Sequence, residues 1–120
     1  MHEVAVAQQM LEAVLSAAGA HGATRVRVAR LRLGTLACVD PQTLSFAFEV
    51  ACRGTLAQGC LLEVQRVALR VRCRGCGAEG ERGDPLEPCG ACGTAGGEVL
   101  AGREIRLTTL DVDGPGEARA

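Results

Sequence analysis

The sequence predicts an α+β domain in which two helices pack against a small β-sheet, with a cysteine-rich module inserted before the last strand. Two segments carry apolar residues at helical spacing, and others show the two-residue period of strands. Residues 73–97 are dense in glycine, lack an apolar period and hold four of the seven cysteines. The chain of 120 residues has the usual size of one domain, so one hydrophobic core with one excursion is expected.

The first helix is predicted over Glu3–Ala18, with Gly19 closing its last turn. Its apolar positions recur at helical spacing: Val4, Ala7, Leu11, Val14, Leu15 and Ala18. The following segment, TRVRVARLRLG, changes to the period of a strand. Val26 and Val28 share one face of this strand, whereas Ala29 and the next two leucines share the other, so a bulge or a cover on both faces is expected.

The second helix is predicted to begin after Asp40, whose side chain suits the N-cap, with Pro41 in the first turn and Gly54 beyond the end. Its expected buried stripe consists of Leu44, Ala47, Phe48 and Ala51. After a loop, CLLEVQRVALRVRC predicts two extended pieces with a kink near Arg66. The second piece leads directly into Cys73.

These elements predict three regions along the chain. An α/β domain over residues 1–72 is expected to be completed by a C-terminal strand over 98–112. The cysteine module occupies residues 73–97, and residues 113–120 are expected to form a disordered polar tail.

The composition argues against nucleic acid as a partner. The formal net charge of −1 gives no long-range attraction for polyanions, and two phenylalanines cannot make a base-stacking platform. The N-terminal segment is amphipathic and begins with histidine and glutamate, unlike a secretory signal, and no apolar stretch approaches membrane-spanning length. We therefore expect a cytoplasmic protein with no membrane partner, whose cysteines are more plausible as metal ligands or small core residues than as disulfides.

Two CxxC pairs are the strongest chemical signal in the chain. The paired residues are Cys73, Cys76, Cys89 and Cys92. A CxxC turn brings two thiolates to one side, and the glycine that follows each pair can adopt a left-handed conformation that lets backbone N–H groups point at sulfur. Four thiolates with no open position predict a zinc-ribbon-like four-cysteine module with structural Zn(II), which replaces the missing core.

Other interpretations of the cysteines stay open at this point. Buried free cysteines, a dithiol redox pair, an iron–sulfur site and a rubredoxin-like iron site are the alternatives to zinc. The remaining cysteines are expected to be small core residues: Cys38, Cys52 and Cys60.

The chain opens with MHE, and His2 is one of only two histidines. The amine of Met1, the amide of His2 and its imidazole can wrap one ion in consecutive chelate rings with the nitrogen donors in a plane. Square-planar nitrogen ligation favours Ni(II) or Cu(II) over zinc. A further donor is expected from Glu3 or from Asp40. Each acid also has an ordinary structural role, Asp40 as an N-cap and Glu3 in the first turn of a helix.

The terminal MHE, its amphipathic helix, a strand, an aspartate-led second helix and the CxxCG…CxxCG doublet together resemble the HypA/HybF family of hydrogenase nickel-incorporation proteins. The similarity extends to about Val112. The resemblance implies a nickel site that contains Met1, His2 and Glu3, with Asp40 matching an aspartate associated with that site. It also implies zinc binding by the four paired cysteines.

The resemblance implies a carrier, not an enzyme. It would take up Ni(II) as transient cargo, dock with a HypB-type GTPase and pass the ion to the precursor of a [NiFe]-hydrogenase large subunit, as a monomer or a homodimer. Zn(II) would be structural. An exposed terminal site suits this task because a buried cage would hold the ion too long for transfer.

Two other function classes stay open. A zinc-ribbon adaptor or a nucleic-acid-binding module could use the arginines of the predicted strands as a basic face, with MHE accidental. A thiol oxidoreductase or a zinc hydrolase is disfavoured, because four cysteine ligands leave no open coordination position and only His2 and His21 could serve a catalytic set.

Overall fold

The computed structural model describes residues 2–114 and contains two helices, a short 3-10 helix and six strands. In chain order these are α1 (His2–Ala20), β1 (Arg25–Gly34), η1 (Thr35–Ala37), α2 (Pro41–Cys52), β2 (Leu61–Val67), β3 (Arg70–Arg72), β4 (Glu79–Glu81), β5 (Glu98–Ala101) and β6 (Ile105–Asp113). The predicted α+β class, with two helices, small sheets and a four-cysteine cluster, is confirmed. Met1 and residues 115–120, which include most of the predicted tail, lie outside the described residues.

The chain divides into two compact units. Among the described residues, the first unit contains 2–32, 39–65 and 106–114, and the second contains 33–38 and 66–105. The second unit is wider than the predicted module of 73–97, because the extended segments on both sides of the insert pair with each other in an antiparallel β3–β5 ladder. The second unit therefore contains the insert together with the extended segments on both sides of it.

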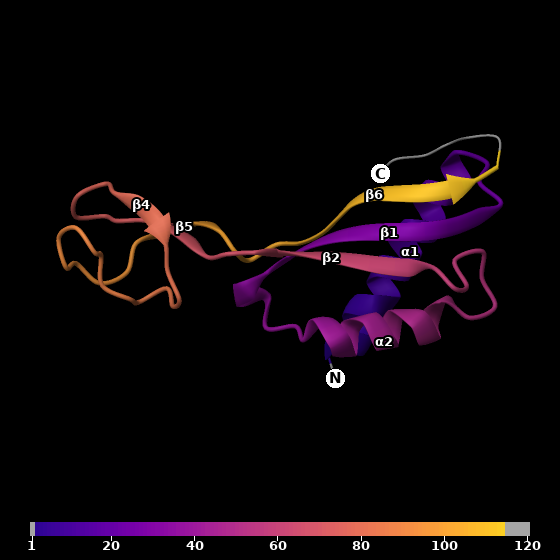
Figure 1. The fold of residues 1–120 in the computed structure, drawn as a ribbon, viewed down its shortest axis with the longest axis horizontal. Helices are drawn as coiled ribbons and strands as arrows, with labels where there is room; N and C mark the ends of the chain where they lie inside the picture. The colour runs from indigo at the N-terminus through magenta and orange to yellow at the C-terminus, as the bar shows by residue number, and fades with distance from the viewer. Residues whose placement is uncertain (1, 115–120) are drawn as a thin grey trace. The chain divides into compact units, whose positions relative to one another are not determined.

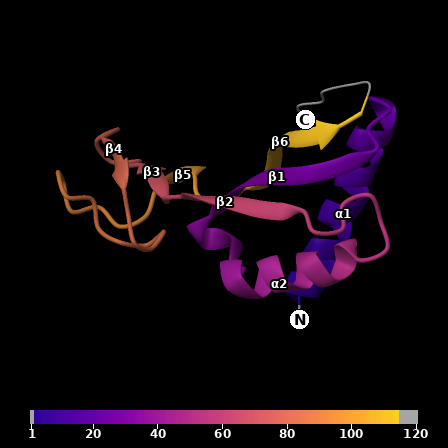
Figure 2. The same cartoon turned by 45° about the vertical axis from the view of Figure 1, so that its right-hand side comes forward.

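The first unit is a three-stranded sheet of order β2-β1-β6 with α1 and α2 on one side (Figures 1 and 2). The buried residues of α1 are Ala7, Met10, Leu11, Val14 and Ala18. The buried residues of α2 are Leu44, Phe48 and Cys52. In β1, Val26 is buried, and so are Ala29, Leu31 and Leu33 on the other parity, so this strand buries residues of both faces as predicted.

The helix α1 ends later than Gly19, the predicted terminator. Gly22 has a φ of 68°, its N–H donates to the Gly19 carbonyl (3.2 Å), and the N–H of Ala23 donates to the Ala18 carbonyl (3.0 Å). This pattern is a Schellman motif, in which the left-handed glycine follows the last helical turn. The prediction for Gly19 was wrong because an earlier glycine can remain helical when a later one supplies the terminating conformation.

The predicted strand over 98–112 is two strands in two different sheets. The strand β5 belongs to the sheet of order β4-β3-β5, whereas β6 belongs to the first sheet. Gly102 separates them with a φ of 115°, and a Cβ at this position would lie 2.7 Å from the Cα of Leu69. The close approach and the positive φ both require glycine and end the strand.

The C-terminal strand extends one residue into the predicted tail. The carbonyl of Asp113 accepts a hydrogen bond from the N–H of Thr24 (2.8 Å), and its carboxylate pairs with Arg27 (3.0 Å). These contacts hold Asp113 as the last residue of β6. Within residues 2–114, no helix combines the length and the apolar character needed to cross a bilayer.

Candidate metal centres

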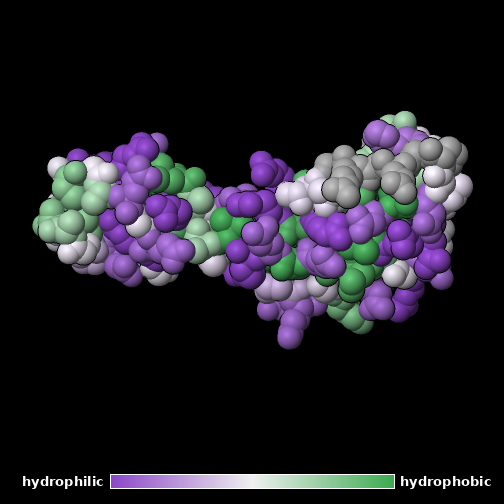
Figure 3. All heavy atoms as spheres, turned by 45° about the horizontal axis from the view of Figure 1, so that its top comes forward, coloured by the Kyte–Doolittle hydropathy of each residue, from purple (hydrophilic) through white to green (hydrophobic). Residues whose placement is uncertain are grey.

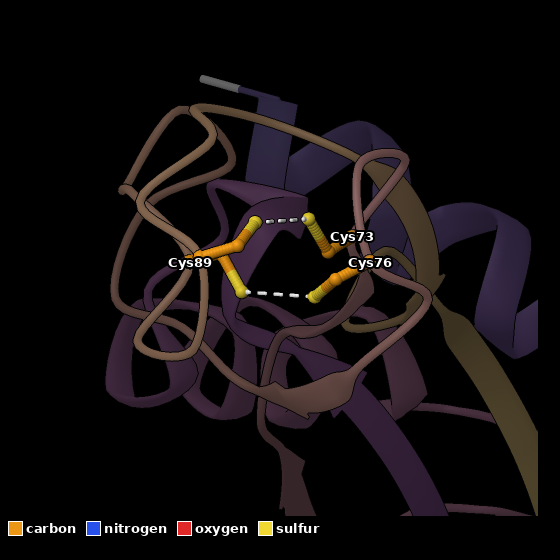
Figure 4. Close-up of side chains that lie close together, drawn as sticks. Cys73, Cys76 and Cys89 are labelled. Carbon is orange, nitrogen blue, oxygen red and sulfur yellow. Dashed lines mark hydrogen bonds between the residues drawn. The ribbon is translucent and has the colours of Figure 1, made fainter.

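The four paired cysteines converge on one point in the second unit. Their sulfur atoms all lie within 4.8 Å of one another. The Sγ atoms of Cys73 and Cys92 are 3.5 Å apart, and those of Cys76 and Cys89 are 3.7 Å apart. Figure 4 shows the labelled side chains of Cys73, Cys76 and Cys89 pointing toward one another. A tetrahedron with zinc–sulfur distances of about 2.3 Å has sulfur–sulfur edges of about 3.8 Å, so the donor set fits such an ion.

The first cysteine loop, residues 73–78, is closed by hydrogen bonds between its own backbone groups. The N–H of Cys73 donates to the Ala78 carbonyl (2.8 Å), and the N–H of Gly77 donates to the Cys73 carbonyl (2.9 Å). Gly77 has a φ of 78°, as its position after the pair predicts. The N–H of Gly75 points at the Sγ of Cys73 (3.3 Å). The loop therefore offers two sulfurs on one side and supports one of them with an amide.

The second cysteine loop, residues 89–94, has the same backbone geometry. The N–H of Cys89 donates to the Thr94 carbonyl (2.8 Å), and the N–H of Gly93 donates to the Cys89 carbonyl (2.8 Å). Gly93 has a φ of 79°, and the N–H of Ala91 points at the Sγ of Cys89 (3.4 Å). The first cysteine of each pair is buried and the second is exposed. The two loops are thus equivalent halves of one site.

The local environment of the second loop favours thiolate. The backbone N–H groups of Cys92 and Ala91 lower the pKa of the Cys89 thiol to about 6. The hydroxyl and backbone of Thr94 lower the pKa of Cys92. For Cys76, the backbone of Ala78 acts to lower the pKa, but the neighbouring thiols together with desolvation raise it to about 11. Four thiolates this close repel one another, so a bound cation is what allows all four to ionise.

The structure also brings together three residues that the sequence analysis assigned to nickel. The Nε2 of His2 lies 3.3 Å from the Oε2 of Glu3, and the backbone N–H of Asp40 donates to the same oxygen (3.2 Å). The side chain of His2 is 59% exposed and that of Glu3 is 14% exposed. The hydrogen bond from Asp40 is the main cause that lowers the pKa of Glu3. The predicted fourth member, Met1, lies outside the described residues.

Asp40 meets this group through its backbone and uses its carboxylate as the predicted N-cap. Its Oδ2 accepts hydrogen bonds from the N–H of Thr43 (2.8 Å) and from the Thr43 hydroxyl (2.6 Å). Thr43 is not among the residues predicted for this site, although a hydroxyl residue three positions after an N-cap aspartate is visible in the sequence. The cap fixes the start of α2 and with it the amide that reaches Glu3.

The other cysteines have three different environments. Cys52 is buried, as predicted, and desolvation raises the pKa of its thiol to about 11. Cys60 is half-buried. Cys38 is exposed with a φ of 55°, so its assignment to the core was wrong. Among residues 2–114, the four paired cysteines form the one group of three or more histidine, cysteine or acidic side chains close enough to share an ion.

Comparisons with known proteins all identify the same family. Residues 1–112 match a family model described as hydrogenase/urease nickel incorporation, metallochaperone, hypA. The chain is 36% identical over 112 residues to the hydrogenase maturation factor HypA of Nitrosospira multiformis, covering 93% of this chain and 97% of that one. It is 41% identical over 112 residues to HypA of Streptomyces avermitilis, covering 92% and 86%.

Solved structures show the same fold. The solution structure of the Ni metallochaperone HypA from Helicobacter pylori matches with a TM-score of 0.68 and 18% identity, covering 93% of this chain and 97% of that one. A second solution structure of a HypA protein matches with a TM-score of 0.70 and 19% identity, covering 93% and 96%.

Proposed function

This chain belongs to the HypA family of hydrogenase/urease nickel-incorporation metallochaperones, and we propose that it binds Ni(II) at its N-terminus and delivers the ion during hydrogenase maturation. The proposed recipient is the precursor of a [NiFe]-hydrogenase large subunit, reached with a HypB-type GTPase. Nickel is the cargo, so no bond of a substrate is broken. The proposed compartment is the cytoplasm.

The observation that carries the proposal is the position of the Glu3 carboxylate between His2 and Asp40, the N-cap residue of α2. One carboxylate oxygen lies 3.3 Å from the imidazole and 3.2 Å from the Asp40 nitrogen. We propose that the amine of Met1, the amide of His2 and its imidazole hold Ni(II), while Glu3 orients the imidazole and adds negative charge. Planar nitrogen donors suit Ni(II).

The position of His2 also suits release of the ion. Its side chain is 59% exposed and stands in the first turn of α1, where amide groups have no intrahelical carbonyl to bond. An acceptor protein can therefore approach the imidazole directly. The alternative, a site enclosed by protein, would need local unfolding before transfer.

We propose that the four paired cysteines hold Zn(II) as a structural ion. When bound, a tetrahedral zinc ion supplies cross-linking and no open position for chemistry. The residues of the chain supply the rest: two left-handed glycines close the loops, and backbone amides of Gly75 and Ala91 point at sulfur. Iron would suit the same four sulfurs, and visible absorption of the pure protein distinguishes it from colourless zinc.

The observed ion pairs weaken the nucleic-acid alternative. Arg30 on the central strand pairs with Glu63 (2.9 Å) and with Asp111 (2.9 Å). Arg72 pairs with Glu79 (3.2 Å) and Glu98 (3.3 Å). Figure 3 shows hydrophilic side chains spread over the visible surface of both units, with apolar ones between them. Because acids neutralise Arg30 and Arg72, these two arginines add little to the basic face that the nucleic-acid alternative requires.

Metal analysis and nickel titration of protein with an authentic N-terminus test the proposed function. We expect one equivalent of zinc and a Ni(II) complex with the absorption of planar nitrogen coordination. The same protein with residues added before Met1 should bind Ni(II) much more weakly, since the amine is then lost. Equal isotherms for the two proteins would move the nickel site elsewhere.

A further inference from the structure

Thr94 makes three contacts at the four-cysteine site, and one of them is with the opposite cysteine loop. Its Oγ1 lies 3.2 Å from the Sγ of Cys92, and its carbonyl accepts the N–H of Cys89 (2.8 Å). Its side chain also lies against Gly75 of the other loop, where a Cβ would come within 2.7 Å of the Thr94 Oγ1. One residue therefore touches both cysteines of its own loop and the backbone of the opposite loop.

The equivalent position in the first loop lacks this side chain. Ala78 accepts the N–H of Cys73 (2.8 Å) just as Thr94 accepts that of Cys89, and it has no hydroxyl. The strand pair Arg72–Glu79 encloses the first loop, and the bridge Pro88–Ala95 encloses the second. Because the backbones of the two loops are this similar, the main difference at this position is the side-chain hydroxyl, which is present at Thr94 and absent at Ala78.

A hydroxyl beside Cys92, one of the four proposed ligands, affects how well its sulfur is held and shielded from water. It is the exposed cysteine of its pair, and its Sγ is 3.5 Å from that of buried Cys73. A metal-bound thiolate carries no proton, so the hydrogen between Cys92 and Thr94 must then come from the hydroxyl. A donated hydrogen bond stabilises a thiolate that water would otherwise reach and protonate.

We infer that Thr94 is a positioning residue of the four-cysteine centre: its hydroxyl holds the Cys92 thiolate in place, and its side chain, seated on Gly75, sets the spacing of the two loops. This inference rests on the proposed metal site at the cysteines. Groups that orient metal ligands in this way typically change metal affinity by about 10–100-fold when they are removed. The effect should fall on the second loop, because the first has alanine at this place.

The substitution Thr94→Val tests the inference because valine keeps the shape that packs on Gly75 and removes only the hydroxyl. We expect its Zn(II) affinity, measured by competition with a chromophoric chelator, to fall by about tenfold or more. Thr94→Ser restores the hydroxyl and should recover most of the affinity. The matched control is Thr24→Val, which removes a hydroxyl that donates to the Asp113 carbonyl (3.3 Å) in the other unit and should leave zinc affinity unchanged.

Cobalt substitution separates failure of the inference from failure of the site. Co(II) in wild-type protein and in Thr94→Val should both give the absorption of four thiolate ligands, which shows that the variant still folds around the ion. If wild-type protein shows no such spectrum, both the metal site and the role of Thr94 are overturned. If the spectrum is present and Thr94→Val binds zinc as tightly as wild type, or Thr94→Ser is as weak as Thr94→Val, the inference alone is overturned.

Discussion

The first unit and residues 73–97 of the second unit differ in how much apolar surface they bury. In the first, apolar side chains from α1, β1 and α2 bury one another, and the buried positions follow helical and strand periods. Between residues 73 and 97 in the second, only Cys73 and Cys89 are buried. A segment with two buried residues cannot offset its conformational entropy by hydrophobic burial. The same chain thus uses a hydrophobic core in one place and, in another, four converging cysteine side chains that we propose bind zinc.

The largest expected effect is on residues 73–97, where only two residues are buried. Cys73→Ser removes one of the four proposed ligands of a zinc site whose total binding free energy is on the order of 10 kcal/mol. We expect zinc to be lost and the amides of residues 73–97 to lose protection from hydrogen exchange, while α1 and α2 keep theirs. The control is Cys38→Ser, which changes an exposed thiol outside the cluster. A Cys73→Ser protein that retains one equivalent of zinc at wild-type affinity would contradict the four-ligand site.

The second effect falls on the first unit and leaves its core intact. His2→Ala removes an imidazole that is 59% exposed, so stability and zinc content should not change. Loss of the imidazole opens the chelate, and we expect Ni(II) affinity to fall by about 100-fold or more, equivalent to about 2.7 kcal/mol. His21→Ala is the matched control, since it removes the other imidazole of the chain from an exposed position. Equal nickel isotherms for His2→Ala and wild type would refute the assignment.

The sequence predicts the local features of both units, and the reason is physical. Helix and strand periods follow from burial against a core, so α1, α2 and β1 could be predicted within a few residues. The left-handed glycines after each CxxC pair were also predictable, because that turn requires them. Each of these features can be read from the residue pattern of a single segment of the chain.

Features that depend on distant residues could not be predicted. The division of strand 98–112 into β5 and β6 depends on the approach of Gly102 to Leu69. The hydrogen bond between Glu3 and Asp40 joins residues 37 positions apart. Thr94 became visible only when the other loop was seen to leave room for it at Gly75. Each case needs the tertiary structure, because no local period encodes which distant backbone comes close.

A third substitution, at Glu3, should weaken nickel binding less than His2→Ala does. The N–H of Asp40 lowers the pKa of this carboxyl from 4.5, so the contact stabilises the fold above pH 4.5 and is lost as the pH falls through the lower folded value. In an NMR titration we expect the Asp40 amide to report a midpoint below pH 4.5. Glu3→Gln should remove this transition and weaken Ni(II) binding by roughly tenfold, through loss of charge beside the imidazole. A midpoint at or above pH 4.5 would show that the contact is not formed in solution.

The smallest effect on nickel is expected at Asp40, and it separates a positioning role from ligation. Asp40→Ala removes the N-cap to Thr43 and should lower the free energy of unfolding by about 1 kcal/mol, whereas Asp40→Asn keeps a good cap and should cost little. Both variants keep the backbone N–H that Glu3 accepts, so we expect nickel affinity within about threefold of wild type when the fold is intact. Chemical denaturation and nickel titration of the two proteins make the comparison. If Asp40→Asn loses nickel as completely as His2→Ala while keeping its stability, the carboxylate is a ligand and the N-cap is its secondary role.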